Sequence, residues 1–107
     1  MGATTFGVMG RPGEKDVKKA YDEACAQARD EYGHQQGYNG TISTTSGVKV
    51  VLAKPVPASK LSELEEPYLD GVADDTIGKW MNAGAIAVAG ADGHTFHRWY
   101  FFGWAAE

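Results

Sequence analysis

Apolar residues near the N-terminus recur at a spacing that predicts one amphipathic helix. Its stripe follows the helical period and consists of Val17, Ala20, Tyr21, Ala24, Ala28 and Tyr32. Asp16 stands in the N-cap position, and Gly33 stands where a left-handed residue would end the helix. Lys19 and Glu23 are one turn apart on the outer face, where they can pair. The preceding residues, 1–13, predict a loose arm or a short strand.

Alternating apolar and polar residues predict a first β-hairpin over residues 41–52. Ser46-Gly47 supplies its turn signal. Pro55 and Pro57 follow the second strand. Because proline donates no hydrogen bond to a β-ladder, we expect that strand to stop before them.

A second hairpin is predicted at the C-terminus. A strand of small residues, 83–90 (AGAIAVAG), leads into Asp92-Gly93, a dipeptide that supplies the positive φ of a tight turn. A long aromatic strand follows over residues 94–106 (HTFHRWYFFGWAA). Residues 59–82, between the two hairpins, predict one or two short helices, with Pro67 in the first turn of the second.

These elements predict a single small α+β domain over residues 1–107 in the order (β)-α-β-β-α-β-β. We expect an antiparallel sheet of two hairpins with the helices on one face. The length of 107 residues and the hydrophobic content of 43% are typical of one globular domain.

The net charge of −4 narrows the class of partner. A long nucleic acid is bound through a basic surface, which an acidic chain does not offer. A basic protein, or a small ligand gripped by one local cationic spot, is compatible with this charge. No apolar run approaches the roughly 20 residues of a spanning helix, so we expect a cytoplasmic protein that binds no membrane. The single cysteine allows no internal disulfide.

Residue types that carry chemistry are present, but not in catalytic patterns. His94 and His97 point to opposite faces of a strand, and their spacing matches no zinc site. Cys25 adjoins the apolar stripe of the helix, which predicts a buried structural thiol. Residues 7–15 (GVMGRPGEK) lack the ending of a phosphate loop and favour a simple turn, although its backbone N–H groups and Arg11 could bind an anion. We predict no metal, no cofactor and no catalytic residue.

The C-terminal strand carries large rings on both faces. In the predicted fold only one face can pack on the helices, so the other predicts an interface with a partner or with a second copy of the chain. The residues predicted to line this interface are His97, Trp99, Phe101 and Trp104. The alternative is that the strand simply lies at the centre of a small core.

The segment after the first helix, residues 31–44 (EYGHQQGYNGTIST), predicts a ligand site. Backbone N–H groups of Gly-rich turns can cradle an anion, and the neighbouring side chains offer a ring and hydroxyl groups. The predicted ligand-binding residues are His34, Tyr38, Asn39, Gly40, Thr41, Ser43 and Arg98. An ordinary joint between a helix and a strand is the alternative interpretation.

Three pieces of the chain, EYGHQQGYNGTIST, KWMNAGAIAV and FFGWAAE, resemble small proteins of bacteriophages and other mobile elements. The resemblance covers most of residues 16–107. It implies a phage context and the cytoplasm of a host cell, where small phage proteins are often inhibitors of host defence. No activity is settled for that family, so the resemblance carries over no catalytic residue.

The leading hypothesis is therefore a non-enzymatic binding protein that inhibits a host defence system. It would occupy a host protein or sequester a small nucleotide-like ligand. A second hypothesis is a small hydrolase of a nucleotide or similar substrate, which uses His34 with Thr41 or Ser43. A third is a structural module that self-assembles through its aromatic face, and we expect a homo-oligomer.

Overall fold

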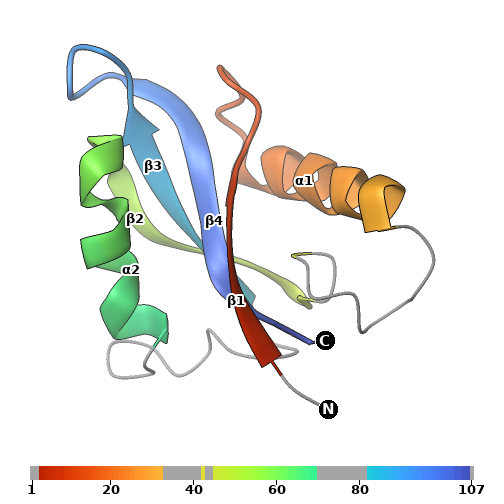
Figure 1. Cartoon of the computed structure of the whole chain (residues 1–107). Helices are drawn as coiled ribbons and strands as arrows, with labels where there is room; N and C mark the ends of the chain where they lie inside the picture. The colour runs from red at the N-terminus through yellow and green to blue at the C-terminus, as the bar shows by residue number, and fades with distance from the viewer. Residues whose placement is uncertain (1–2, 33–41, 43–44, 70–81, 107) are drawn as a thin grey trace.

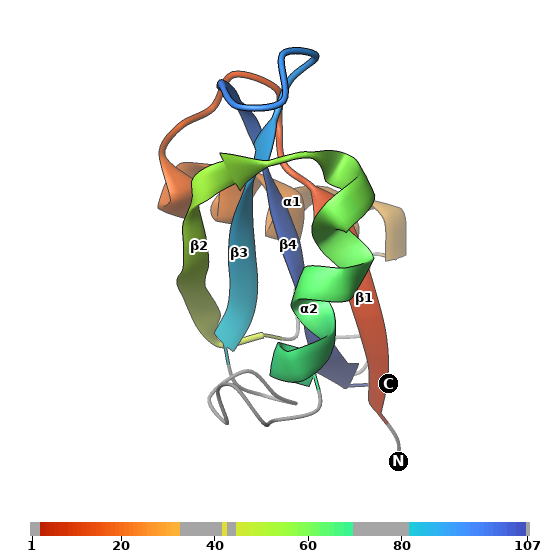
Figure 2. The same cartoon turned by 90° about the vertical axis from the view of Figure 1, so that its left-hand side faces the viewer.

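The computed structural model describes residues 3–32, 42, 45–69 and 82–106. Its strands form one four-stranded sheet in the order β1-β4-β3-β2, with a helix against each face (Figures 1 and 2). In chain order, the elements are β1 (Ala3–Met9), α1 (Val17–Tyr32), β2 (Gly47–Val56), the 3₁₀ turn η2 (Ala58–Lys60), α2 (Leu61–Leu69), β3 (Asn82–Ala89) and β4 (Phe96–Ala106).

The predicted α+β class and order of elements are confirmed, but two features of the predicted sheet are wrong. β2 runs parallel to β3, so the sheet is mixed and not purely antiparallel. The two helices cover opposite faces, since α1 packs on the side of Phe101 and α2 on the side of Phe102. Consecutive residues of a strand point to opposite faces, and both faces of β4 are therefore covered.

The second strand of the first predicted hairpin has a different partner from the one expected. It forms β2, which pairs with β3 from Gly47 opposite Asn82 onward. A parallel pair needs a long crossover, and here the crossover contains η2 and α2. Residues 41, 43 and 44 of the hairpin's first strand lie outside the described part of the chain. On either side of residues 43 and 44, Thr45 N donates a hydrogen bond to Ile42 O at 3.0 Å.

Two prolines that were predicted to mark the end of a strand and the start of a helix lie inside these elements instead. β2 continues through Pro55 to Val56, which an edge strand of the sheet tolerates. Pro67 lies inside α2 and not in the first turn of a separate helix. The hydrogen bond that its missing N–H removes belongs to the last turn before α2 ends at Leu69.

The hairpin of β3 and β4 is confirmed. Gly93 has φ +80°, the left-handed conformation expected of Asp92-Gly93. Asp92 accepts a hydrogen bond from the Thr95 hydroxyl through Oδ2, and bonds from the backbone N–H groups of Thr95 and His94 through Oδ1, at 2.8 and 3.0 Å. These hydrogen bonds, that of the Thr95 hydroxyl first, hold the pKa of the Asp92 carboxyl well below its usual range.

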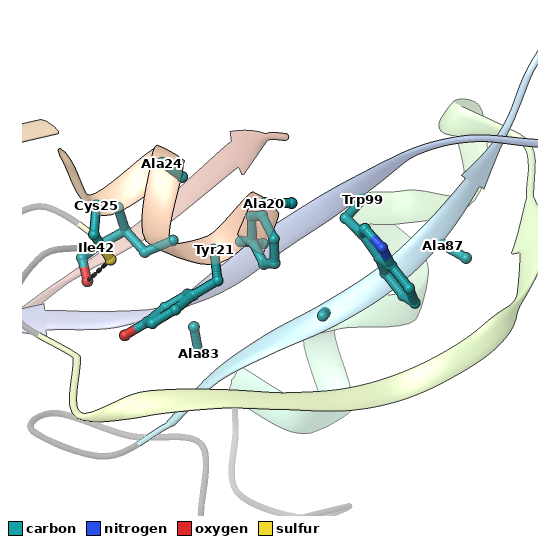
Figure 3. Close-up of a cluster of buried hydrophobic side chains, with 10 residues drawn as sticks. Ala20, Tyr21, Ala24, Cys25, Ile42, Ala83, Ala87 and Trp99 are labelled. Carbon is teal, nitrogen blue, oxygen red and sulfur yellow. Dashed lines mark hydrogen bonds between the residues drawn. The ribbon is translucent and has the colours of Figure 1, made fainter. Parts of the chain in front are cut away.

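One core cluster lies between α1 and the sheet, as Figure 3 shows. The Tyr21 ring meets the Phe101 ring edge to face, with centroids 6.0 Å apart. The Tyr21 hydroxyl lies 2.5 Å from Thr45 Oγ1, and Cys25 Sγ lies 3.8 Å from Ile42 O. Cys25 is 4% exposed, so the prediction of a buried thiol is confirmed.

The other core cluster lies between α2 and the opposite face of the sheet. Its buried members are Leu61, Ile86, Val88 and Phe102. Two polar contacts from β4 hold α2 in place: the Tyr100 hydroxyl donates to Glu65 Oε2, and Trp104 Nε1 donates to Leu69 O at 2.8 Å. The second contact satisfies a carbonyl of the last helical turn, which has no partner within the helix.

The aromatic interface was predicted on the assumption that one face of β4 is uncovered. The structure contradicts this assumption, because a helix covers each face of β4. Phe101 is fully buried and Trp99 is 8% exposed. Trp104 is half-buried beside the end of α2, and only His97 among the predicted interface residues is exposed. The alternative interpretation, a strand at the centre of a small core, is therefore confirmed.

We predict that Gly84→Ala lowers the free energy of unfolding by about 1–3 kcal/mol, the usual cost of overpacking a core. A Cβ at Gly84 would lie 2.4 Å from Phe102 Cζ, on a strand that is buried on both faces. Urea denaturation measures the change. Gly90→Ala is the matched control, since its Cβ would meet only the His97 Cβ at 3.7 Å. Equal effects of the two substitutions would contradict the close fit of Gly84 and Phe102.

A second prediction concerns alkaline pH. Burial raises the pKa of Tyr21 to about 12, whereas an unfolded tyrosine ionises near pH 10. Above about pH 10 the unfolded state loses this proton while the folded state keeps it, so the free energy of unfolding falls as pH rises toward 12. Tyr21→Phe should make this fall shallower in urea titrations at several pH values. An unchanged slope in the variant would show that Tyr21 does not carry it.

Candidate functional site

A hollow of about 350 Å³ lies beside α1, at the end of β1. Its apolar lining comes from Met9, Pro12, Ala20 and Ala24, and its polar side chains are those of Arg11, Glu23, Gln27 and Arg98. The α1 residues at this wall, 20, 23, 24 and 27, follow the helical period. They therefore form one stripe of the helix, in which Ala20 and Ala24 also belong to the core, Glu23 is half-buried and Gln27 is exposed.

The turn between β1 and α1, residues 10–15, borders the hollow and is held to β4 by hydrogen bonds. Gly10 N donates to Trp99 O and Gly13 N donates to His97 O, both at 2.7 Å, which extends the β1–β4 ladder past Met9. The indole Nε1 of Trp99 donates to Lys15 O at 3.0 Å. Gly13 has φ +86°, a conformation that favours glycine. The turn is thus set by backbone and core contacts.

Arg98 reaches the hollow from β4 and is half-buried there. Its Nε donates to Gly10 O at 2.8 Å. Within the described part of the chain, its terminal NH₂ groups have no hydrogen-bonding partner. One end of the guanidinium is therefore fixed by the protein, and the other end keeps donors for a ligand.

Arg11 and Glu23 form a loose ion pair at the same hollow. Arg11 Nε lies 3.6 Å from Glu23 Oε1, beyond hydrogen-bonding distance, while Arg11 also pairs with Glu14 Oε1 at 3.2 Å. Glu23 Oε1 is buried and has no hydrogen-bond partner in the described residues. The expected pair of Glu23 with Lys19 does not form, because Lys19 Nζ lies 3.4 Å from Glu14 Oε1.

Several backbone donors at the start of α1 are already occupied. Asp16 Oδ1 accepts from the N–H groups of Lys18 and Lys19 at 3.0 and 3.2 Å, which confirms the predicted N-cap. Glu14 Oε2 accepts from Asp16 N at 3.4 Å. An anion placed there would face two carboxylates. The groups of this site that could bind an anion are therefore the side chains of Arg11 and Arg98, and not the helix terminus.

Most of the predicted ligand-binding residues lie outside the described part of the chain: His34, Tyr38, Asn39, Gly40, Thr41 and Ser43. Arg98 is described, and it lies at the hollow together with Arg11. The sequence pattern places Glu23 on the outer face of the helix and therefore does not predict its position at the hollow. The stripe at residues 20, 23, 24 and 27 was the signal that could have placed Glu23 beside the two alanines.

In the ranges that the structure describes, no group of three His, Cys, Asp or Glu side chains could hold a metal ion. None of the helices described is long and apolar enough to cross a membrane. Comparison of the chain with protein-family models, with curated proteins and with solved structures found no match. What the chain does is therefore inferred from its own residues.

We predict that Asp16→Ala lowers the free energy of unfolding by about 1 kcal/mol, the usual cost of a lost N-cap. Asp22→Ala is the control on the same helix. It removes only the exposed pair with Lys18 Nζ at 2.9 Å, which stabilises a helix by about 0.5 kcal/mol or less. Thermal unfolding measures both variants. A loss for Asp22→Ala as large as that for Asp16→Ala would show that the cap does not stabilise α1.

Proposed function

We propose that this protein is a non-enzymatic binding protein that holds a small anionic, nucleotide-like ligand in the hollow beside α1. The observation that carries the proposal is Arg98. This half-buried residue is fixed through Nε to Gly10 O, and its terminal NH₂ groups have no hydrogen-bonding partner in the described residues. A planar guanidinium binds phosphate and carboxylate groups through paired N–H donors.

The Arg98 side chain is already oriented by the protein before a ligand binds, and this favours binding. Ordering a long side chain costs free energy when a ligand binds, and the hydrogen bond to Gly10 O reduces that cost. Partial burial also strengthens a charge-assisted hydrogen bond, because less water competes for the donor and the acceptor. Arg11, which is more exposed, adds a second cation at the rim of the hollow.

The size of the hollow supports a ligand of monomer size. Its volume of about 350 Å³ lies at the low end of the ~300–1,000 Å³ that small-molecule sites occupy. The net charge of −4 agrees with this inference, because a chain that tracked a polyanion would need a basic surface. The chain therefore offers a few cationic side chains at one hollow in place of an extended basic surface.

The resemblance to small phage proteins supports a biological setting for such binding. In the cytoplasm of a host cell, the protein would sequester a small nucleotide-like ligand and so inhibit a defence system that depends on it. The other hypotheses have less support in the described residues. The hydrolase residues His34, Thr41 and Ser43 lie outside them, and the Trp99 and Phe101 rings of the proposed self-assembly face are buried within the chain.

Replacement of Arg98 tests the proposal. Arg98→Gln should weaken the binding of a nucleoside monophosphate about tenfold or more, since it removes charge-assisted hydrogen bonds of about 1.5–3 kcal/mol. Arg11→Gln should weaken binding less, because Arg11 is shared with two carboxylates. Isothermal titration calorimetry measures both affinities, and circular dichroism checks the fold.

Lys60→Gln is the matched control, because it removes the same charge from the exposed turn η2. Wild-type affinity in Arg98→Gln, or an equal loss in Lys60→Gln, would contradict a site at Arg98. Absence of any binding of nucleotides or inorganic phosphate to the wild-type chain would contradict the proposed function itself.

A further inference from the structure

We infer that the ligand of this hollow is a guanine mononucleotide, whose base is read by Glu23 and whose phosphate is held by Arg98. The inference rests on the proposed function, since it names the ligand class of the same site. Both side chains line the hollow, and they reach it from different elements, Glu23 from α1 and Arg98 from β4.

Glu23 is the reason to expect a ligand that donates hydrogen bonds. Its side chain is 41% exposed, but its Oε1 is buried and lacks a hydrogen-bond partner among the described residues. The nearest described cation, Arg11 Nε, is 3.6 Å away and is also paired with Glu14. A buried acceptor without a donor is unfavourable, and an N–H group of a ligand would remove that cost.

The two acceptor oxygens of the Glu23 carboxylate favour some nucleobases over others. Two carboxylate oxygens pair best with two parallel N–H donors. Guanine presents such a pair in its ring N1–H and its exocyclic amine. Adenine and cytosine place a ring acceptor beside their amine, and uracil places its one N–H between two carbonyl oxygens. Each of these three would therefore set a lone pair against Glu23.

The apolar lining suits the faces of a purine. Met9 and Pro12, which are exposed, offer apolar surface beside the charged groups, and the buried Ala20 and Ala24 line the hollow from α1. Met9 is 38% exposed, one of the few large apolar side chains that the described chain leaves open to solvent. A thioether makes favourable contacts with aromatic rings. A bound base would cover the exposed side chain of Met9.

The phosphate of the same nucleotide suits Arg98. Its terminal NH₂ groups can donate in parallel to two phosphate oxygens, and the bond from Nε to Gly10 O orients them. The site thus presents an acceptor for the base and donors for the phosphate. A ligand must satisfy both, which excludes inorganic phosphate as the preferred ligand.

Titration of the full chain with guanosine monophosphate, inosine monophosphate, adenosine monophosphate and inorganic phosphate tests the inference. Inosine monophosphate lacks only the exocyclic amine, so we expect it to bind about tenfold more weakly than the guanine nucleotide, the effect of one hydrogen bond to a charged group. Glu23→Gln should abolish this preference, because an amide cannot accept both N–H groups. Glu23→Asp keeps the carboxylate and should retain part of the preference.

Glu63→Gln is the matched control, since it removes the same charge from an exposed position on α2 and should leave the preference intact. Equal affinity of the wild-type chain for all three nucleotides, with loss in Arg98→Gln, would overturn the guanine assignment and leave the anion site standing. Binding of a zwitterionic amino acid in place of the nucleotides would also overturn it. Absence of any binding would overturn both proposals.

Discussion

The fold depends on the fit between the large residues of β4 and the small residues of β3. Phe102 is paired with Gly84, Phe101 with Ala85 and Trp99 with Ala87. A sheet covered by a helix on each face buries its central strands on both sides, and the rings of β4 supply apolar area to both cores. Close packing then requires that the neighbouring strand be small, so that the helices and rings meet without voids or overlap.

The candidate site is an extension of this packing. Trp99 belongs to the core through its ring, and it holds the turn before α1 through its backbone O and its indole N–H. Arg98, the preceding residue, fastens the same turn through Gly10 O. The burial of β4 therefore determines where Arg98 lies relative to α1. A site supported by a rigid core in this way keeps its donors in place before a ligand binds.

Local chemistry made part of this structure predictable. The Asp16 cap, the Asp92-Gly93 turn and the burial of Cys25 each depend on a few adjacent residues, and the sequence predicts them correctly. The partner of β2 depends on a contact between distant segments, which local alternation does not specify. Local alternation instead pairs β2 with the residues just before it, and so it predicts both helices on one face and an exposed Phe101 ring, which the structure contradicts. Arg98, which the sequence predicts as a ligand-binding residue, lines the hollow together with Glu23, which the sequence places on the outer face of the helix.

Charged side chains of both signs lie around the hollow, so they would attract a distant anion only weakly and would act mainly through direct contacts. Arg11 is shared between Glu14 and Glu23, so much of its field is cancelled close to the protein. The chain as a whole is acidic, and at physiological ionic strength charges further apart than roughly 8 Å are screened. An anion bound at the proposed site would therefore be steered weakly and would be held by short-range hydrogen bonds to Arg98. The proposed site would therefore favour ligands that also donate a hydrogen bond to the buried oxygen of Glu23.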